Sequence, residues 1–341
     1  MKGNVYFLGA GASKGSDFEL PLMKGFFREE DLASNEYTHL KEFKDTRFPE
    51  TPINDLNMEE VITHLELILE GFRWDPVEVS AQYQTRTEFL KYVKNRLDLK
   101  GEKQICEKHR SLFKGIKLEE DTILTLNYDL IVDKVLYEIT KDTKGRLNNG
   151  PLTRGYCLTE ERATFGGTLS TSLPVTEESL YIKLHGSIDW LYCPNPSCPN
   201  NRRLLPNWID SPSFHNEPGG PCGICGTGYD VAIIPPSMKK SFEKFPKLGL
   251  LWRVAFEKLR KAGTIILIGI SLPDSDYYLR WLIREAMIKR EVLPNLIVVN
   301  PDSPDTDKNA IVKAKALTGV KKAKWYKGLL NFIEKKCEGD V

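Results

Sequence analysis

The sequence lacks any strong bias of charge and any long apolar run, and both absences exclude whole classes of protein. The formal net charge is +1 across 341 residues, so the chain has neither a global basic field for nucleic acid nor an acidic tail. No apolar run approaches the roughly 20 residues that span a bilayer, and the apolar part of the N-terminal stretch is too short for a secretory signal. We therefore expect a globular, cytoplasmic protein without direct contact to membrane or nucleic acid.

Cysteine is scarce, with only seven residues in the chain. Three of them, Cys106, Cys157 and Cys337, show no pairing pattern. This argues against a disulfide framework and for a reducing compartment. We interpret these three residues as structural or surface thiols.

The other four cysteines form two close pairs. Four residues separate Cys193 from Cys198, twenty-three residues follow, and two residues separate Cys222 from Cys225. This spacing is typical of a tetrathiolate zinc site. The intervening loop is too poor in apolar residues for a core of its own, so zinc would supply its folding energy. His215 in this loop is an alternative ligand, although four cysteines already suffice.

Short apolar runs alternate with helical patterns, which predicts an α/β fold with a doubly wound parallel sheet. Several runs are continuously apolar, as expected for strands that helices cover on both faces. The predicted strands are Val5–Leu8, Thr122–Leu126, Tyr181–Leu184, Val231–Ile234, Thr264–Ile268 and Leu296–Val299. The predicted helices between them are Leu130–Ile139, Leu248–Ala262 and Ser275–Arg290.

The interval from about residue 25 to residue 118 contains no convincing strand. Asn57 and Glu60 have the spacing of a capping box, which predicts a helix over Met58–Leu69. Thr87–Leu99 is amphipathic at helical spacing. We interpret this interval as a helical insertion after the first strand.

A glycine-rich turn follows the first predicted strand. Gly9, Ala10, Gly11 and Ser13 stand where a dinucleotide-binding fold places its phosphate-binding turn, before the next helix. The third glycine of the usual pattern is misplaced. A tight turn without a ligand is therefore the alternative.

Polar residues follow later predicted strands. Asn127 and Asp129 stand at the ligand-binding edge of an open α/β sheet, although one of them could cap the next helix. His185 ends a strand and is either a structural histidine or a general base. Gly269 with Ser271, and Asn300, follow two further strands, where they suit close approach to a ribose or adenine or form ordinary turns.

The order of these motifs resembles that of the sirtuin superfamily, over roughly residues 3 to 302. The resemblance implies a Rossmann-like domain and a small zinc-bearing lobe, with NAD as co-substrate in the crevice between them. It implies that the pyrophosphate is held by Gly9, Ala10, Gly11 and Ser13, and that Asn127 and Asp129 form the nicotinamide pocket. It implies that His185 and Asn127 are catalytic, with His185 as the base. It implies contacts to the ribose and adenosine from Gly269, Ser271 and Asn300.

The resemblance also implies a division of the chain. Residues 1–24, 119–190 and 230–310 would form the discontinuous Rossmann-like NAD-binding domain, residues 25–118 the helical insertion, residues 191–229 the zinc-binding module and residues 311–341 a C-terminal segment. The zinc would be structural, because four cysteines leave no open coordination position.

Departures from the protein-deacylating sirtuins indicate the divergent bacterial sirtuin-like branch. The deacylases usually have Gln where this chain has Leu126, and residues 233–240 replace the segment that lines their peptide groove. Members of the divergent branch mainly hydrolyse NAD, often in anti-phage defence, so the resemblance implies release of nicotinamide and ADP-ribose. A four-cysteine lobe is, however, a trait of the deacylating branch. NAD-dependent protein-lysine deacylation is therefore the alternative.

Two further alternatives belong to other classes. One is a catalytically silent sensor of NAD or ADP-ribose, and the other is a zinc-ribbon interaction protein on a degenerate α/β scaffold. The resemblance further implies a homo-oligomer that a partner activates, with an ATPase of the HerA type as one candidate.

Overall fold

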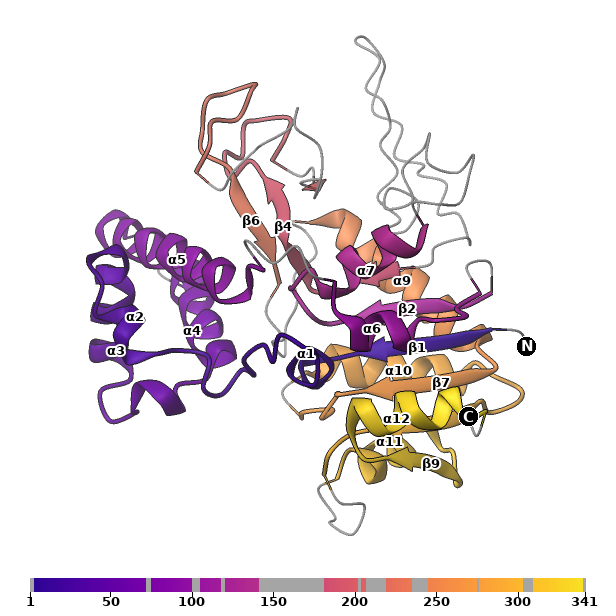
Figure 1. Ribbon diagram of the computed structural model, residues 1–341. Coiled ribbons are helices and arrows are strands. Elements are labelled where there is room, and N and C mark those ends of the chain that lie inside the picture. Colours follow the sequence, from indigo (N-terminus) through magenta and orange to yellow (C-terminus); the bar gives the residue numbers. More distant parts are fainter. Residues whose placement is uncertain are drawn as a thin grey trace.

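The structure is a computed structural model, and its largest element is a parallel sheet of six strands (Figure 1). The strands are β1 (Asn4–Leu8), β2 (Thr122–Thr125), β3 (Tyr181–Lys183), β7 (Thr264–Ile268), β8 (Asn295–Val299) and β9 (Ala323–Tyr326). The structure describes residues 3–71, 75–99, 105–117, 120–140, 181–201, 204–206, 219–234, 245–274, 276–302 and 309–339.

The strand order is β3-β2-β1-β7-β8-β9, with every pair parallel. Counted along the chain within this sheet, that order is 3-2-1-4-5-6, which is the doubly wound order of a dinucleotide-binding fold. The predicted α/β sheet is thereby confirmed. The order reverses between β1 and β7, which pair in register from Asn4 with Thr264 to Leu8 with Ile268.

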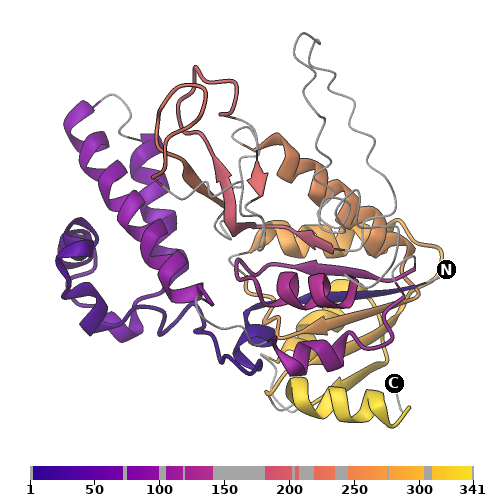
Figure 2. The same ribbon diagram turned by 45° about the horizontal axis from the view of Figure 1, so that its top comes forward.

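Helices cover both faces of this sheet, as the continuously apolar strands require. Helix α6 (Glu107–Leu112) packs against α7 (Ile131–Thr140) and α12 (Gly328–Cys337). Helix α10 (Tyr277–Ile288) packs against α9 (Pro246–Lys261) and α11 (Ala310–Thr318) on the opposite face (Figures 1 and 2). Except for β9, the strands between them are largely buried.

Between β1 and β2 the described residues form helices only, as expected for the insertion. After the short α1 (Ala10–Lys14), a separate helical body stands beside the sheet (Figure 1). Its elements are α2 (Glu29–Leu32), η1 (Asn35–Tyr37), α3 (Thr38–Arg47), η2 (Ile53–Asp55), α4 (Met58–Gly71) and α5 (Pro76–Leu97). Buried aromatic rings hold this body together, with Phe27 stacked on Tyr92 at 5.3 Å between ring centroids.

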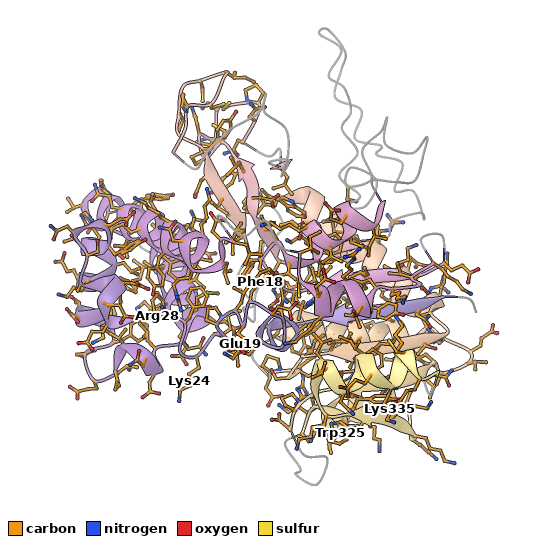
Figure 3. The ribbon with its side chains drawn as sticks, viewed as in Figure 1. Phe18, Glu19, Lys24, Arg28, Trp325 and Lys335 are labelled. Atoms are coloured by element: carbon orange, nitrogen blue, oxygen red, sulfur yellow. The ribbon has the colours of Figure 1, made fainter. Side chains whose placement is uncertain are left out.

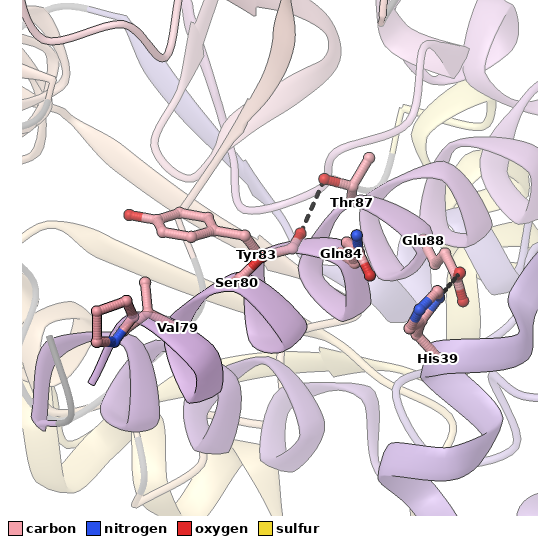
Figure 4. A pocket seen from close by; sticks show the side chains of 8 residues that line it. His39, Val79, Ser80, Tyr83, Gln84, Thr87 and Glu88 are labelled. Atoms are coloured by element: carbon pink, nitrogen blue, oxygen red, sulfur yellow. Dashed lines mark hydrogen bonds and ion pairs between the residues drawn. The ribbon is translucent and has the colours of Figure 1, made fainter.

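The helix boundaries within the insertion follow the sequence only in part. The Asn57 side chain accepts a hydrogen bond from the Glu59 N–H at 2.8 Å, so Asn57 does cap α4. Helix α5 begins eleven residues before the predicted Thr87, because Pro76 is well suited to a first helical position. Along the outer face of α5 runs a pocket of about 780 Å³ that includes the His39–Glu88 pair (Figure 4).

A second, smaller sheet carries the four-cysteine lobe. Its strands are β4 (Gly186–Tyr192), β6 (Asp230–Ile233) and the two-residue β5 (Leu205–Pro206), all antiparallel. The alternation had indicated that the run Val231–Ile234 belongs to the parallel sheet, and this interpretation is wrong. A continuous apolar run specifies burial but not which sheet buries it. Among the described helices, none combines the length and apolarity needed to cross a bilayer.

Candidate nucleotide-binding and catalytic site

The candidate site begins at the reversal of strand order between β1 and β7. The Gly9 N–H donates to the Ile268 carbonyl at 2.9 Å, and the Gly11 N–H donates to the Gly269 carbonyl at 2.9 Å. The turns after the two strands are therefore bonded to each other. In open α/β sheets, ligands bind in the crevice outside this point.

The glycines of this turn allow it to pack directly against the turn after β7. A Cβ on Gly11 would lie 2.7 Å from the Gly269 Cα, and a Cβ on Gly269, which has φ +62°, would lie 2.1 Å from the Ala12 nitrogen. The two backbone turns therefore approach each other closely, and the expected approach of a pyrophosphate stays a prediction.

Substitution of Gly11 tests this packing. We expect Gly11→Ala to cost about 1–3 kcal/mol of unfolding free energy, because the methyl group overpacks the contact with Gly269. We expect Gly71→Ala to be nearly neutral, because the added methyl meets no described atom within 4 Å. Urea denaturation of both variants measures the difference. Equal unfolding free energies of the two variants would contradict a close contact between Gly11 and Gly269.

Asn127 and Ser13 join the glycine turn to the segment after β2. The Asn127 Nδ2 donates to the Ser13 Oγ at 2.8 Å and to the Gly9 carbonyl at 3.0 Å. The Ser13 Oγ donates to Asp129 Oδ2 at 2.6 Å. Two motifs more than a hundred residues apart are thus brought into direct contact.

Asp129 also caps the helix that follows it. Its Oδ1 accepts the Ile131 N–H at 3.0 Å, while Oδ2 binds Ser13. The sequence left open whether Asn127 or Asp129 caps this helix, and the structure shows that Asp129 does. Asn127 is only partly buried. Burial raises the pKa of Asp129, and nearby Lys183 and the Ser13 hydroxyl oppose the rise.

A buried ion pair lies beneath this segment. The Lys183 Nζ donates to the Asp129 main-chain carbonyl at 2.6 Å and to Asp133 Oδ2 at 3.1 Å. Both charged side chains are fully buried. The Tyr181 hydroxyl donates to Asp133 Oδ2 at 2.9 Å. Lys183, the last residue of β3, therefore connects the strand that precedes His185 with the loop that carries Asn127.

His185 lies at the joint between the two sheets, separated by one residue from the end of β3 and directly before β4. Its Nε2 stands 3.6 Å from Asp276 Oδ2, and both side chains are almost fully buried. The His185 ring stacks on Trp252, with 5.9 Å between the ring centroids and 22° between the ring planes. Trp252 donates its indole N–H to the Leu184 carbonyl at 2.8 Å. The imidazole is thus held between a carboxylate and an aromatic face.

The remaining predicted residues follow β7 and β8 at the same edge of the sheet. Ser271 is exposed, whereas Asn300 is buried and its Oδ1 accepts the Asp302 N–H at 2.9 Å. Leu272, between them in the chain, is buried with φ +50°, a backbone region that disfavours a branched side chain. Such strain is commonly found at ligand-binding sites.

The four cysteines of the lobe converge. Their Sγ atoms lie within 4.8 Å of one another, with 3.5 Å from Cys193 to Cys225 and 3.8 Å from Cys198 to Cys222. A tetrahedral site with zinc–sulfur bonds of about 2.3 Å has sulfur–sulfur distances of about 3.8 Å. The donor set therefore fits a structural zinc ion. His215 and the segment 235–240 lie outside the described residues.

Metal analysis tests this site. We expect about one equivalent of zinc in the purified protein, because four thiolates close the coordination sphere. Cys222→Ser should lose the metal and destabilise the lobe. Cys337→Ser, an exposed cysteine outside the cluster, should retain it. Zinc-free wild-type protein would refute the assignment.

Asp189 in β4 is expected to make the unfolding free energy of the protein depend on pH. Burial, with Asp133 nearby, raises the pKa of Asp189 to about 7. A carboxyl group with a raised folded-state pKa favours folding at low pH, and this contribution is lost as the pH rises from about 4 to about 7. We expect Asp189→Asn to flatten that decline in unfolding free energy. If the decline of unfolding free energy with pH were unchanged in Asp189→Asn, groups other than Asp189 would be its cause.

Three residues of this constellation were not predicted from the sequence. Asp276 and Lys183 are separated from their partners by long stretches of chain, and Trp252 lies in an ordinary amphipathic helix. The available signals were weak: Asp276 stands at a helix start, where a cap is expected, and Lys183 interrupts an apolar strand. A charge in a buried strand requires a partner.

The sheet order, the bonded turns at its reversal and the cysteine cluster define a Rossmann-type α/β fold with a small second sheet beside a candidate tetrathiolate metal site. Over nearly its whole length the chain is similar to solved Sir2 structures. A Sir2 homologue mutant in complex with ADP-ribose is 14% identical with a TM-score of 0.45, covering 99% of this chain and 94% of that one. A Sir2 homologue in complex with NAD is 16% identical with a TM-score of 0.45, covering 98% and 90%. A Sir2 complex with a p53 peptide and NAD+ is 13% identical with a TM-score of 0.46, covering 99% and 92%. No family model and no curated protein matches the sequence.

Proposed function

We propose that this protein binds NAD at the carboxyl edge of the parallel sheet and cleaves the bond between nicotinamide and ribose. The observation that carries the proposal is the contact of Asn127 with Ser13 and Gly9, one strand away from His185. These residues come from three strand ends that meet at one edge. The edge is where a doubly wound sheet binds its ligand.

In this proposal the turns after β1 and β7 receive the pyrophosphate, and Asn127 holds the nicotinamide carboxamide. Asp129 positions Asn127 through Ser13, since both of its carboxylate oxygens accept hydrogen bonds from protein groups. Ser271 and Asn300, at the ends of β7 and β8, contact the ribose and adenosine. Cleavage leaves an electron-poor ribosyl centre, which the site must stabilise as nicotinamide departs.

His185 is the general base of the proposed reaction. An imidazole that takes a proton from water or a ribose hydroxyl becomes positively charged, and the Asp276 carboxylate 3.6 Å away stabilises that charge. Trp252 fixes the plane of the ring. The pair resembles the base and orienting group of other hydrolases, an analogy of arrangement only.

Water is the proposed nucleophile. His185 is only 2% exposed and stacked under Trp252, an arrangement that admits a small nucleophile more readily than a polypeptide. The products are then nicotinamide and ADP-ribose. Deacylation of protein lysine is the second candidate, and the four-cysteine lobe is the observation that favours it.

The biological setting is proposed from the motifs alone. A role in anti-phage defence, a cytoplasmic location, a homo-oligomer and a HerA-type ATPase partner follow from the resemblance to the divergent branch. Chromatography of the protein with and without such an ATPase tests the last two proposals.

Product identification tests the reaction. The protein is incubated with NAD, with and without an acetylated peptide, and the products are separated by mass. Nicotinamide and ADP-ribose without peptide support hydrolysis. Peptide-dependent O-acetyl-ADP-ribose would replace hydrolysis with deacylation, and NAD binding without any product would indicate a sensor.

A further inference from the structure

An exposed apolar surface lies on helix α10 and on the segments beside it, and we call it the α10 face. Among the described residues, six of the twelve exposed large apolar side chains belong to it. Each of the six is between 41% and 63% exposed. They are Tyr277, Trp281 and Ile288 of α10, Val292 and Leu293 of the loop after it, and Val312 of the adjacent α11. Single exposed apolar residues are ordinary, but a gathering of them marks an interaction surface.

The spacing along α10 makes the α10 face continuous. Four exposed residues follow one another at intervals of four, three and four: Tyr277, Trp281, Arg284 and Ile288. Residues at these intervals are neighbours on one side of a helix. The other side of α10 is buried in the fold, through Leu279, Leu282, Ile283, Ala286 and Met287. The α10 face is therefore the outer side of a helix whose inner side is already packed.

The area of the α10 face suits a specific interface. Six large side chains, each about half exposed, present on the order of 500 Å², since a whole aromatic side chain accounts for roughly 150–250 Å². A patch of this size is as large as the largest one on a typical monomer. Two such patches together bury about 1,000 Å², which is the size at which a biological interface is expected.

The order of residues on α10 favours a second copy of this chain as the occupant. Intervals of four and three are those at which residues of one helix face a partner helix. In a twofold pair, residue i contacts residue j of the other copy, and j contacts i. The intervals four, three and four read the same in both directions, so the stripe is complementary to itself when two α10 helices pair antiparallel.

The contacts in such a pair are chemically favourable. A twofold axis midway between Trp281 and Arg284 places the indole of each copy against the Arg284 guanidinium of the other. A guanidinium over an indole face is attracted to it. The same axis places Tyr277 of each copy against Ile288 of the other, so that two apolar side chains are buried together.

The open edge of the main sheet is a poorer surface for a second copy. Strand β9 stands at this edge, which Trp325 marks in Figure 3. The exposed lysines of this strand and its flanks are Lys322, Lys324 and Lys327. Lysines on an edge strand discourage its pairing with another chain. The α10 face carries no such row of like charges.

We propose that two copies of this chain associate through the α10 face, with their α10 helices antiparallel across a twofold axis. This deepens the proposed function, because it rests on the homo-oligomer proposed there and gives it a definite surface. None of the six apolar residues of the α10 face belongs to the candidate site. Association through it therefore leaves the edge of the parallel sheet open to a ligand.

Sedimentation equilibrium without NAD tests the proposal, so its outcome does not depend on NAD cleavage. We expect the wild-type protein to contain an even number of chains. Trp281→Ala should weaken the association about tenfold or more, since a tryptophan at the centre of an interface commonly carries much of its binding energy.

Two complementary variants test the antiparallel register. Tyr277→Glu and Ile288→Lys should each weaken the association, because a charge then lies against an apolar side chain of the other copy. Both substitutions suit the helix itself, since acidic residues favour its first turn and basic residues its last. An equimolar mixture of the two variants should associate again, because the opposite charges meet across the axis. Val77→Glu is the matched control, since Val77 is 80% exposed on α5 and outside the α10 face.

Three outcomes would contradict the proposal. Wild-type protein that stays monomeric up to about 100 µM would overturn it and leave the α10 face to a different protein. Association unchanged in Trp281→Ala, Tyr277→Glu and Ile288→Lys would place the interface elsewhere. Weakened association in the charged variants without recovery in their mixture would overturn the antiparallel pairing.

Discussion

Replacing His185 with alanine is expected to reduce nicotinamide release by about 10²–10⁴-fold, the usual contribution of a positioned general base. The imidazole lies at a strand end and stacks on Trp252, so its removal leaves the main sheet intact. Asn127→Ala should have a loss of similar size, because it removes the contact with Ser13 and the proposed hold on the carboxamide. Nicotinamide release under saturating NAD measures both variants.

His39→Ala is the matched control for this experiment. His39 pairs with Glu88 in the helical insertion at 2.6 Å, in the pocket of Figure 4, and should leave turnover unchanged. Asp276→Asn should lower turnover less than His185→Ala, because it keeps the helix cap and removes only the charge. Full activity of His185→Ala would remove the catalytic assignment.

Replacing Lys183 with methionine is expected to produce the largest loss of stability. Removal of one partner from a fully buried pair leaves the Asp133 carboxylate uncompensated, at a cost of about 3–5 kcal/mol of unfolding free energy. The double variant Lys183→Met, Asp133→Asn should recover part of this loss, because the neutral amide still accepts the Tyr181 hydroxyl. Urea denaturation measures all three proteins.

Substitution of an exposed lysine by methionine is the control for the loss of stability in Lys183→Met. Lys91→Met removes a cation whose side chain is 54% exposed and should change the unfolding free energy by less than about 1 kcal/mol. Equal losses in Lys91→Met and Lys183→Met would contradict the importance of the buried pair. A double variant less stable than Lys183→Met would contradict the charge argument.

The parts of the fold that the sequence predicts are those specified by neighbouring residues. The run Thr264–Ile268 is apolar after its first residue and forms β7, and Cys222 and Cys225 are close in the chain and in space. Strand β9 was not predicted, because its residues are only half-buried or exposed and alternate poorly. Its place in the sheet comes from pairing with β8.

The candidate site divides in the same way. The segments that contain Gly9, Asn127 and His185 could be located because a parallel sheet brings all strand ends to one edge. Their supporting partners depend on tertiary contacts that no local pattern encodes. The bond from Lys183 to Asp133 and the approach of Asp276 to His185 are of this kind.

Gly186 links the two sheets and has φ +85°, and a Cβ on it would lie 2.0 Å from the Ala232 carbonyl oxygen. His185 precedes this glycine, and its main-chain carbonyl accepts a hydrogen bond from the Ile234 N–H at 2.8 Å. The backbone of His185 is therefore bonded to the small sheet, whose strands β4 and β6 flank the segment that contains the four cysteines. We expect loss of a metal ion from the four cysteines to disturb the small sheet and, through this backbone connection, the position of His185.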